Sequence, residues 1–167
     1  MKKLLALLFL ALPMGLFAQE VKIAYVDVQA VFSAMPEVPG IEKQMSDLND
    51  QYQKDLKSMQ DEYQKKYSDF TAQQDSLTEN IKLRRMQEIQ ELQNRIENFY
   101  PIAQDDINKK QQQLVAPVQD KIKNAIKAVG EEKGYTYILA MNPQLFLYTG
   151  NGAIDATPFV KAKLGLK

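Results

Sequence analysis

Two pairs of adjacent carboxylates, Asp105–Asp106 and Glu131–Glu132, have the spacing closest to that of an acid–base pair or a metal site. Neighbouring residues on a helix point in different directions, and neither pair has a second set of ligands beside it. The chain also contains no His and no Cys, which excludes Ser-His-Asp and Cys-His nucleophiles, the usual zinc sites and disulfide bonds. The sequence therefore predicts no catalytic, metal or cofactor site, and we do not expect an enzyme.

Charge is balanced over the 167 residues, with 21 Lys and Arg against 21 Asp and Glu. Duplex nucleic acid requires many clustered basic side chains to neutralise its phosphates. No nucleic-acid partner is therefore predicted. The apolar fraction of 45% and the charged fraction of 25% are typical of one soluble domain.

Side chains suited to loose binding of other proteins are present instead. Met and Tyr recur between residues 45 and 67, among them Met59 and Tyr63, and both residue types suit promiscuous surfaces. The alternative is that this stripe packs against a neighbouring helix. Tyr100 is the better candidate for an exposed aromatic side chain, and its neighbour Pro101 acts either as a hinge or as a harmless kink.

A local basic group is formed by Lys82, Arg84 and Arg85. It has two interpretations. One is a contact with a bound protein or with the inner or outer membrane surface, and the other is a solvated helix start balanced by Asp75 and Glu79.

Gln is frequent on the polar positions of the same region. Such a face is uncharged and hydrogen-bonding, so it could line a binding cavity or be an ordinary solvated helix. Its members are Gln51, Gln53, Gln60, Gln64, Gln73, Gln74, Gln87, Gln90, Gln93 and Gln111–Gln113.

The first residues resemble a secretory signal peptide. Lys2 and Lys3 precede an apolar run over residues 4–12, and a cleavage site follows Ala18. An uncleaved membrane anchor is the alternative, but the run is short for a bilayer. Export without any Cys favours a bacterial periplasm over a disulfide-stapled extracellular scaffold.

The central part of the chain predicts two long helices. Residues 41–129 contain no Gly, and apolar residues recur there every three or four positions. Ser76 and Glu79 form a capping-box pattern that would start a second helix. We therefore expect an antiparallel hairpin over residues 41–116 with its tip near 73–77, a kink at Pro101 and a second bend at Pro117.

The flanking segments, residues 19–40 and 117–167, predict a small β-body. Strands are expected over residues 21–28, 135–141 and 145–149, a helical turn capped by Asp27 over 29–34, and a terminal helix over 158–164 with Thr157 as its N-cap. The side chains expected in the core of the body or of the trimer are Ile23, Tyr25, Val26, Tyr137, Leu139, Leu145 and Leu147. Three short strands leave bare edges and too small a core, so further copies of the chain are expected to close them into a barrel.

The ordered combination of leader, strand, long charged hairpin, two strands and terminal helix resembles the Skp/OmpH family of periplasmic chaperones. The opening segment 22–32, the sequence Ala34-Met35-Pro36-Glu37 and the run from Leu114 into the strands at 135–149 carry the resemblance. It implies an α+β homotrimer in which three helical tentacles project from a shared β-barrel body around a cavity.

The resemblance also implies a function. Members of the family hold unfolded outer-membrane β-barrel proteins in that cavity without ATP, and they keep these proteins from aggregating. The family's best-known members are strongly basic, whereas residues 41–116 here hold 11 basic and 14 acidic side chains, so client binding is expected to depend only weakly on salt. The alternative function is a structural coiled-coil spacer of the cell envelope that has no client.

Overall fold

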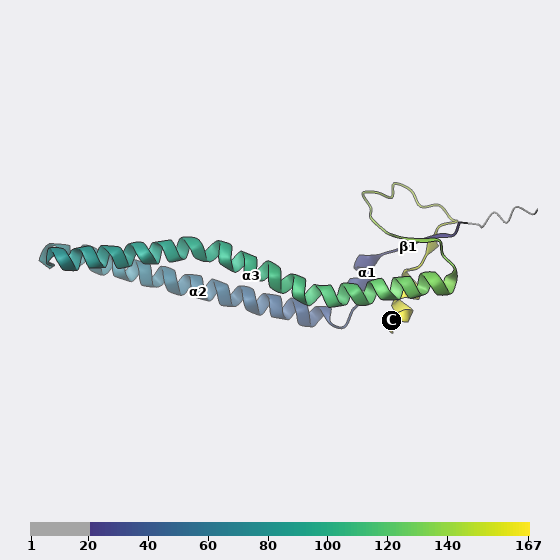
Figure 1. Ribbon diagram of the computed structural model, residues 1–167, viewed down its shortest axis with the longest axis horizontal. Helices are drawn as coiled ribbons and strands as arrows, with labels where there is room; N and C mark the ends of the chain where they lie inside the picture. Colours follow the sequence, from purple (N-terminus) through teal and green to yellow (C-terminus); the bar gives the residue numbers. More distant parts are fainter. Residues whose placement is uncertain (1–20) are drawn as a thin grey trace, which may run out of the picture.

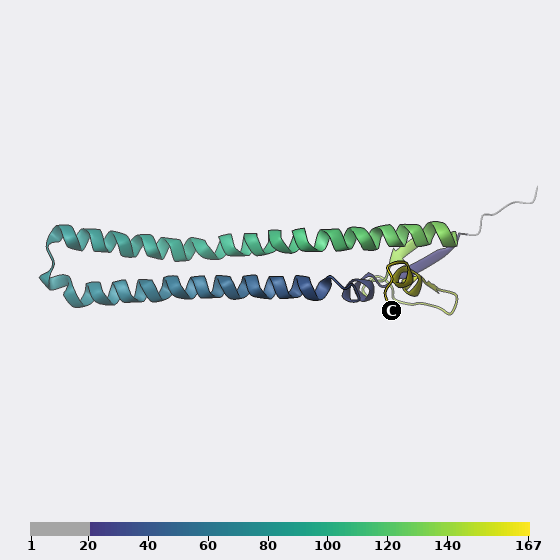
Figure 2. The same ribbon diagram turned by 90° about the horizontal axis from the view of Figure 1, so that it is seen from below.

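Two long helices run side by side, joined at one end, with a small body at the other end (Figure 1 and Figure 2). The computed structural model describes residues 21–167, so the predicted leader over residues 1–18 lies outside the described residues. The elements in chain order are β1 (Ile23–Val26), α1 (Val28–Ser33), α2 (Val38–Gln73), η1 (Gln74–Ser76), α3 (Glu79–Lys133), β2 (Tyr137–Ala140), β3 (Ile154–Asp155) and α4 (Thr157–Lys163).

The long helices begin and end where their backbone chemistry allows. α2 starts before the expected residue 41 because Pro39 lies in its first turn, where a missing N–H leaves no bond unmade. α3 continues through Pro101 and Pro117 and ends at Gly134, whose φ of 66° is left-handed. Figure 1 shows α3 curving along its length. Within residues 21–167, no helix combines the length and the apolar character needed to cross a membrane.

The turn at the tip differs from its predicted capping. Ser76 does not cap α3, because its hydroxyl donates to the Gln73 carbonyl at 2.8 Å. Thr78 takes the N-cap position instead, without a side-chain hydrogen bond to the backbone. The 3-10 turn η1 is followed by the extended residue Leu77, which separates Ser76 from the free N–H groups of α3.

The sheet is parallel throughout, in the order β2-β1-β3. The third strand predicted over residues 145–149 is wrong, because these residues lie in the loop between β2 and β3. Leu145 and Phe146 both donate their N–H groups to the Asn142 carbonyl at 2.9 Å, which turns them away from the sheet. The second edge of β1 pairs with β3 instead.

Two hydrogen bonds of the Asp27 residue connect β1, α1 and α4. The Asp27 carboxylate accepts from the Ala30 N–H at 2.8 Å and caps α1 as predicted. Its own N–H donates to the Thr157 hydroxyl at 2.9 Å. The sequence predicted Thr157 as the N-cap of α4, but Ala156 holds that position.

The hydrophobic core lies between the sheet, the body end of α3 and the short helices α1 and α4. Its buried members are Val26, Val31, Met35, Val38, Val118, Ile122, Ala125, Val129 and Val160. Because side chains alternate along a strand, Ala24 and Val26 of β1 are the buried pair, at 2% and 1% exposed.

Most of the expected core side chains of the body lie outside this core. Strand alternation places Ile23 and Tyr25 on the opposite face from Val26, and Ile23, Tyr137 and Leu139 are exposed while Tyr25 is half-buried. Leu145 and Leu147 lie in the loop and are 76% and 93% exposed. Within the single chain, Val26 is the one buried member of that set, and burial of the others in a trimer stays a prediction.

Candidate functional surfaces

Asp105 and Asp106 each have a separate partner. Asp105 binds Lys109 at 2.5 Å, and this hydrogen bond raises the pKa of the Lys109 ammonium. Asp106 accepts from the Tyr52 hydroxyl of α2 at 2.9 Å, which raises the pKa of the Tyr52 phenol. Asp105 therefore pairs within its own helix, whereas Asp106 links α3 to α2, the two arms of the hairpin.

The second pair is divided in the same way. Glu131 lies 3.9 Å from Lys127 on the same helix, and Glu132 pairs with Lys163 of α4. Among the residues that the structure describes, no three Asp, Glu, His or Cys side chains are grouped so that they could hold a metal ion.

The seam, meaning the contact between α2 and α3, is narrow. Between residues 41 and 102, Leu92 is the one fully buried apolar side chain, at 3% exposed. Met59 and Tyr63 are half-buried. Met59 and Tyr63 thus pack in the seam and keep an accessible edge, and their contact with other proteins stays a prediction.

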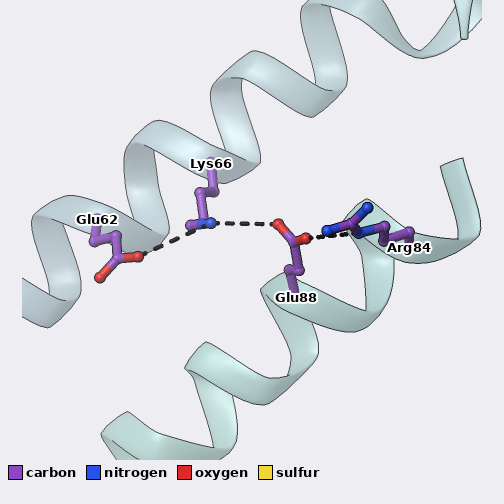
Figure 3. Close-up of polar contacts among 4 residues, drawn as sticks. All are labelled: Glu62, Lys66, Arg84 and Glu88. Carbon is purple, nitrogen blue, oxygen red and sulfur yellow. Dashed lines mark hydrogen bonds and ion pairs between the residues drawn. The ribbon is translucent and has the colours of Figure 1, made fainter. Parts of the chain in front are cut away.

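Charged side chains link the two arms near the tip (Figure 3). Lys66 of α2 lies 3.3 Å from the Glu88 carboxylate of α3 and 3.9 Å from Glu62 of its own helix. Glu88 also lies 3.4 Å from the Arg84 side chain. These groups are partly or largely exposed, so each pair contributes little to stability, typically below about 1 kcal/mol.

The other two basic residues proposed as contacts also have partners in the tip. Lys82 pairs with Glu79 at 3.0 Å, and Arg85 donates to the Gln73 side chain at 3.1 Å. All three side chains of the basic group, Lys82, Arg84 and Arg85, therefore have partners within the chain.

Tyr100 is an exposed aromatic side chain in the middle of α3. It is 69% exposed, and Ile102 beyond Pro101 is 61% exposed. Tyr100 borders a shallow hollow of about 160 Å³ between the arms, which Asn49 and Gln104 also line. Helix α3 is continuous at Pro101.

An apolar groove that the sequence did not predict lies between α1 and α3. It has a volume of about 520 Å³ and is lined by Val28 and Phe32 of α1 and by Val115 and Ile126 of α3. The available signal was Val115, an apolar residue that follows Leu114 after the run Gln111–Gln113.

The outer face of the sheet is apolar and only partly covered. Ile23, Tyr137 and Leu139 on this face are 49%, 59% and 41% exposed, and the loop after β2 adds Leu147 and Tyr148 at 93% and 85%. A cavity of about 450 Å³ separates this loop from the sheet. Contiguous exposed apolar surface of this kind is typical of interaction sites.

These features define a class of protein: a long helical hairpin on a small mixed body, with apolar surfaces left uncovered. The family described as "Outer membrane protein (OmpH-like)" matches residues 22–164. The chain therefore belongs to the OmpH-like family.

A solved structure has the same fold. It is the crystal structure of a candidate outer membrane chaperone (OmpH-like) from Caulobacter crescentus CB15 at 2.83 Å resolution, with a TM-score of 0.72 and 12% sequence identity. The similarity covers 86% of this chain and 83% of that one. No curated protein matches the chain.

Proposed function

We propose that the protein is an ATP-independent holdase of the periplasm, which binds unfolded outer-membrane β-barrel proteins and keeps them from aggregating. The match to the OmpH-like family over residues 22–164 is the observation that carries this proposal. The proposal includes no enzymatic activity. The predicted leader supports the periplasmic location.

The working form is a homotrimer in this proposal. The outer sheet face carries Ile23, Tyr137 and Leu139 in contact with water, and a two-residue strand such as β3 protects little of the sheet edge. Packing the same face of three copies together would bury these side chains and leave the three hairpins projecting from one body. Burial of apolar surface contributes roughly 25 cal/mol per Å², which favours such an assembly.

The hairpins would then form the walls of a cavity for the client. An unfolded outer-membrane strand exposes alternate apolar side chains, and many weak contacts can shield them without a fixed binding pose. Each wall would be a single pair of helices, joined by a narrow seam around the buried Leu92. Such walls bend at low cost and can accommodate clients of different size.

Light scattering tests the proposal. A urea-unfolded outer-membrane barrel protein is diluted into buffer with and without the mature chain from Gln19, and its aggregation is followed. The holdase proposal predicts that scattering stays low without ATP, and that suppression changes little between low and moderate salt because the arms are nearly neutral. Undiminished aggregation of the client would contradict the proposal and favour the envelope-spacer alternative.

A further inference from the structure

The two arms of the hairpin present two faces of opposite character. Side chains that follow a seam residue by one position lie about 100° around the helix from the seam. Because α2 and α3 are antiparallel, this rotation brings both sets to the same side of the hairpin. The side chains that precede a seam residue lie together on the other side.

We name the first side the uncharged face. Its positions are 46, 49, 53, 57, 60, 64, 68 and 71 of α2 and 83, 86, 90, 93, 97, 100, 104, 108, 111 and 115 of α3. Only Lys57 and Glu97 among these 18 are charged. The rest are mainly Gln, Asn, Ser and Thr, with apolar side chains at 83, 86, 100 and 115.

We name the second side the charged face. Its positions are 44, 47, 51, 55, 58, 62, 66 and 69 of α2 and 81, 84, 88, 91, 95, 98, 102, 106, 109 and 113 of α3. Eleven of these 18 are Asp, Glu, Lys or Arg. The contrast with the uncharged face is too large to be a simple consequence of solvent exposure, since both faces are exposed.

Contacts across the arms confirm this assignment of the faces. Asn49 and Gln53 of α2 line one hollow with Tyr100 and Gln104 of α3, all from the uncharged face. On the other side, Lys66 bridges to Glu88 across the arms (Figure 3).

We propose that the uncharged face is the surface on which the client polypeptide lies, and that the charged face points away from it. This inference rests on the proposed holdase function and specifies its binding surface. Amide and hydroxyl side chains both donate and accept hydrogen bonds, so they can pair with the backbone of any unfolded sequence. They bind without the desolvation cost of buried ions.

Apolar side chains at intervals along this face suit the alternating pattern of an unfolded barrel strand. Leu83 and Met86 near the tip are 58% and 55% exposed, and Tyr100 in the middle is 69% exposed. At the base, Val115 belongs to the 520 Å³ groove between α1 and α3. The face thus offers hydrogen bonds along its length and apolar anchors at three levels.

Two other occupants fit the face less well. An anionic membrane surface attracts clustered Lys and Arg, and Lys57 is the only base on this face. A second copy of the chain would bury more apolar surface on the outer face of the sheet than on a row of exposed amides. The chemistry therefore favours an unfolded, sequence-variable polypeptide.

Site-specific photocrosslinking tests the inference with closely matched positions. A benzophenone amino acid is placed at Gln53 or at Gln51, which are two residues apart, both exposed and on opposite faces. Gln104 and Ile102 form the same kind of pair on α3. Each variant is mixed with a urea-unfolded outer-membrane barrel protein diluted out of denaturant, and products are identified by mass.

We expect crosslinks to the client from positions 53 and 104, with several-fold less product from 51 and 102. Equal yields from both faces, or products from 53 and 104 that contain only a second copy of the chain, would overturn the inference. Light scattering on the unmodified protein separates the two levels. If the client stays soluble while the crosslinks fail to follow the faces, only the face assignment is wrong; if the client precipitates, the holdase function fails and the inference fails with it.

A charge-insertion pair gives a second readout. Gln53→Glu with Gln104→Glu adds two charges to the uncharged face, whereas Gln51→Glu with Asn98→Asp adds two to the charged face. The first variant is expected to bind client roughly tenfold more weakly, because each new charge must be desolvated or left unpaired beneath the client. Equal weakening by the second variant would contradict the assignment, and circular dichroism checks that both variants remain helical.

Discussion

Replacement of Leu92 by alanine is expected to loosen the outer part of the helical arms while the body stays intact. Leu92 is 3% exposed and is the one fully buried apolar side chain between residues 41 and 102. Its neighbours in the seam are half-buried, so water and adjacent side chains can fill part of the space left by the deletion. The outer arms have no other apolar core to compensate for its loss.

The expected magnitude follows from this setting. Leu→Ala in a closed core costs about 2–5 kcal/mol, and sites that can collapse fall at the low end. We therefore expect the free energy of opening the arms to fall by about 2–3 kcal/mol, which corresponds to amide exchange roughly 30- to 140-fold faster. Leu83→Ala is the matched control, because Leu83 lies on the same helix and is 58% exposed. Its effect should stay within about 0.5 kcal/mol.

Hydrogen exchange measured by mass spectrometry resolves the two regions. Leu92→Ala should accelerate exchange in peptides from residues 56–70 and 85–100 and leave peptides around the buried residues Val118 and Val129 unchanged. Equal exchange in the two variants would refute the claim that Leu92 holds the arms together. Acceleration in the body as large as in the arms would refute the claim that the arms open independently.

Three further substitutions test individual features of the fold by urea unfolding. Gly134→Ala should destabilise the chain by roughly 1–2 kcal/mol, because its φ of 66° is left-handed, whereas Gly40→Ala in the open first turn of α2 should stabilise it by about 0.5–1 kcal/mol; the same sign for both would contradict the assignment. Thr157→Val should cost about 1–3 kcal/mol, because the part-buried Asp27 N–H loses its acceptor, and Thr157→Ser should restore most of that stability. Glu37→Gln tests pH dependence: the hydrogen bond from Lys121 lowers the Glu37 pKa below its ordinary 4.5, so its stabilising contribution is present above pH 4.5 and is lost as pH falls through the lowered pKa. The stability difference between wild type and Glu37→Gln should therefore be larger at about pH 7 than at about pH 3, and a difference that grows on acidification would be inconsistent with this ion pair.

The hairpin was predictable from sequence because its signals are local and repeated. An absence of Gly from residue 41 to 129 and a regular apolar spacing indicate two helices without reference to the rest of the molecule. The predicted cap at Ser76 was wrong because the same residues also suit a 3-10 turn. In that turn the Ser76 hydroxyl donates a hydrogen bond to the preceding Gln73 carbonyl.

The sheet was harder to predict because its pairing depends on segments far apart in the chain. Residues 145–149 have the apolar composition of a strand, but the turn bonds to Asn142 and the pairing of β3 with β1 leave them in a loop. The alternation at Ile23 and Val26 was visible, yet the side that faces α3 is decided by packing. In the single chain Val26 is buried and Ile23 is 49% exposed.

The two faces of the hairpin could be predicted only once the pairing of α2 with α3 was known. The sequence indicated one Gln-rich polar face that included both Gln51 and Gln53. These residues lie on opposite faces once the seam position of Tyr52 is known, because each is about 100° from it in opposite directions. Their separation depends on which side of each helix meets the other arm.

Light-scattering mass across a sizing column tests the central claim most directly. The mature chain from Gln19 is mixed with a urea-unfolded outer-membrane barrel protein diluted out of denaturant, and the soluble peak is weighed. The proposal predicts one peak with the mass of three chains plus one client. Trimer eluting alone while the client precipitates would contradict the holdase function, and a peak at the mass of a single chain would contradict the assembly as well.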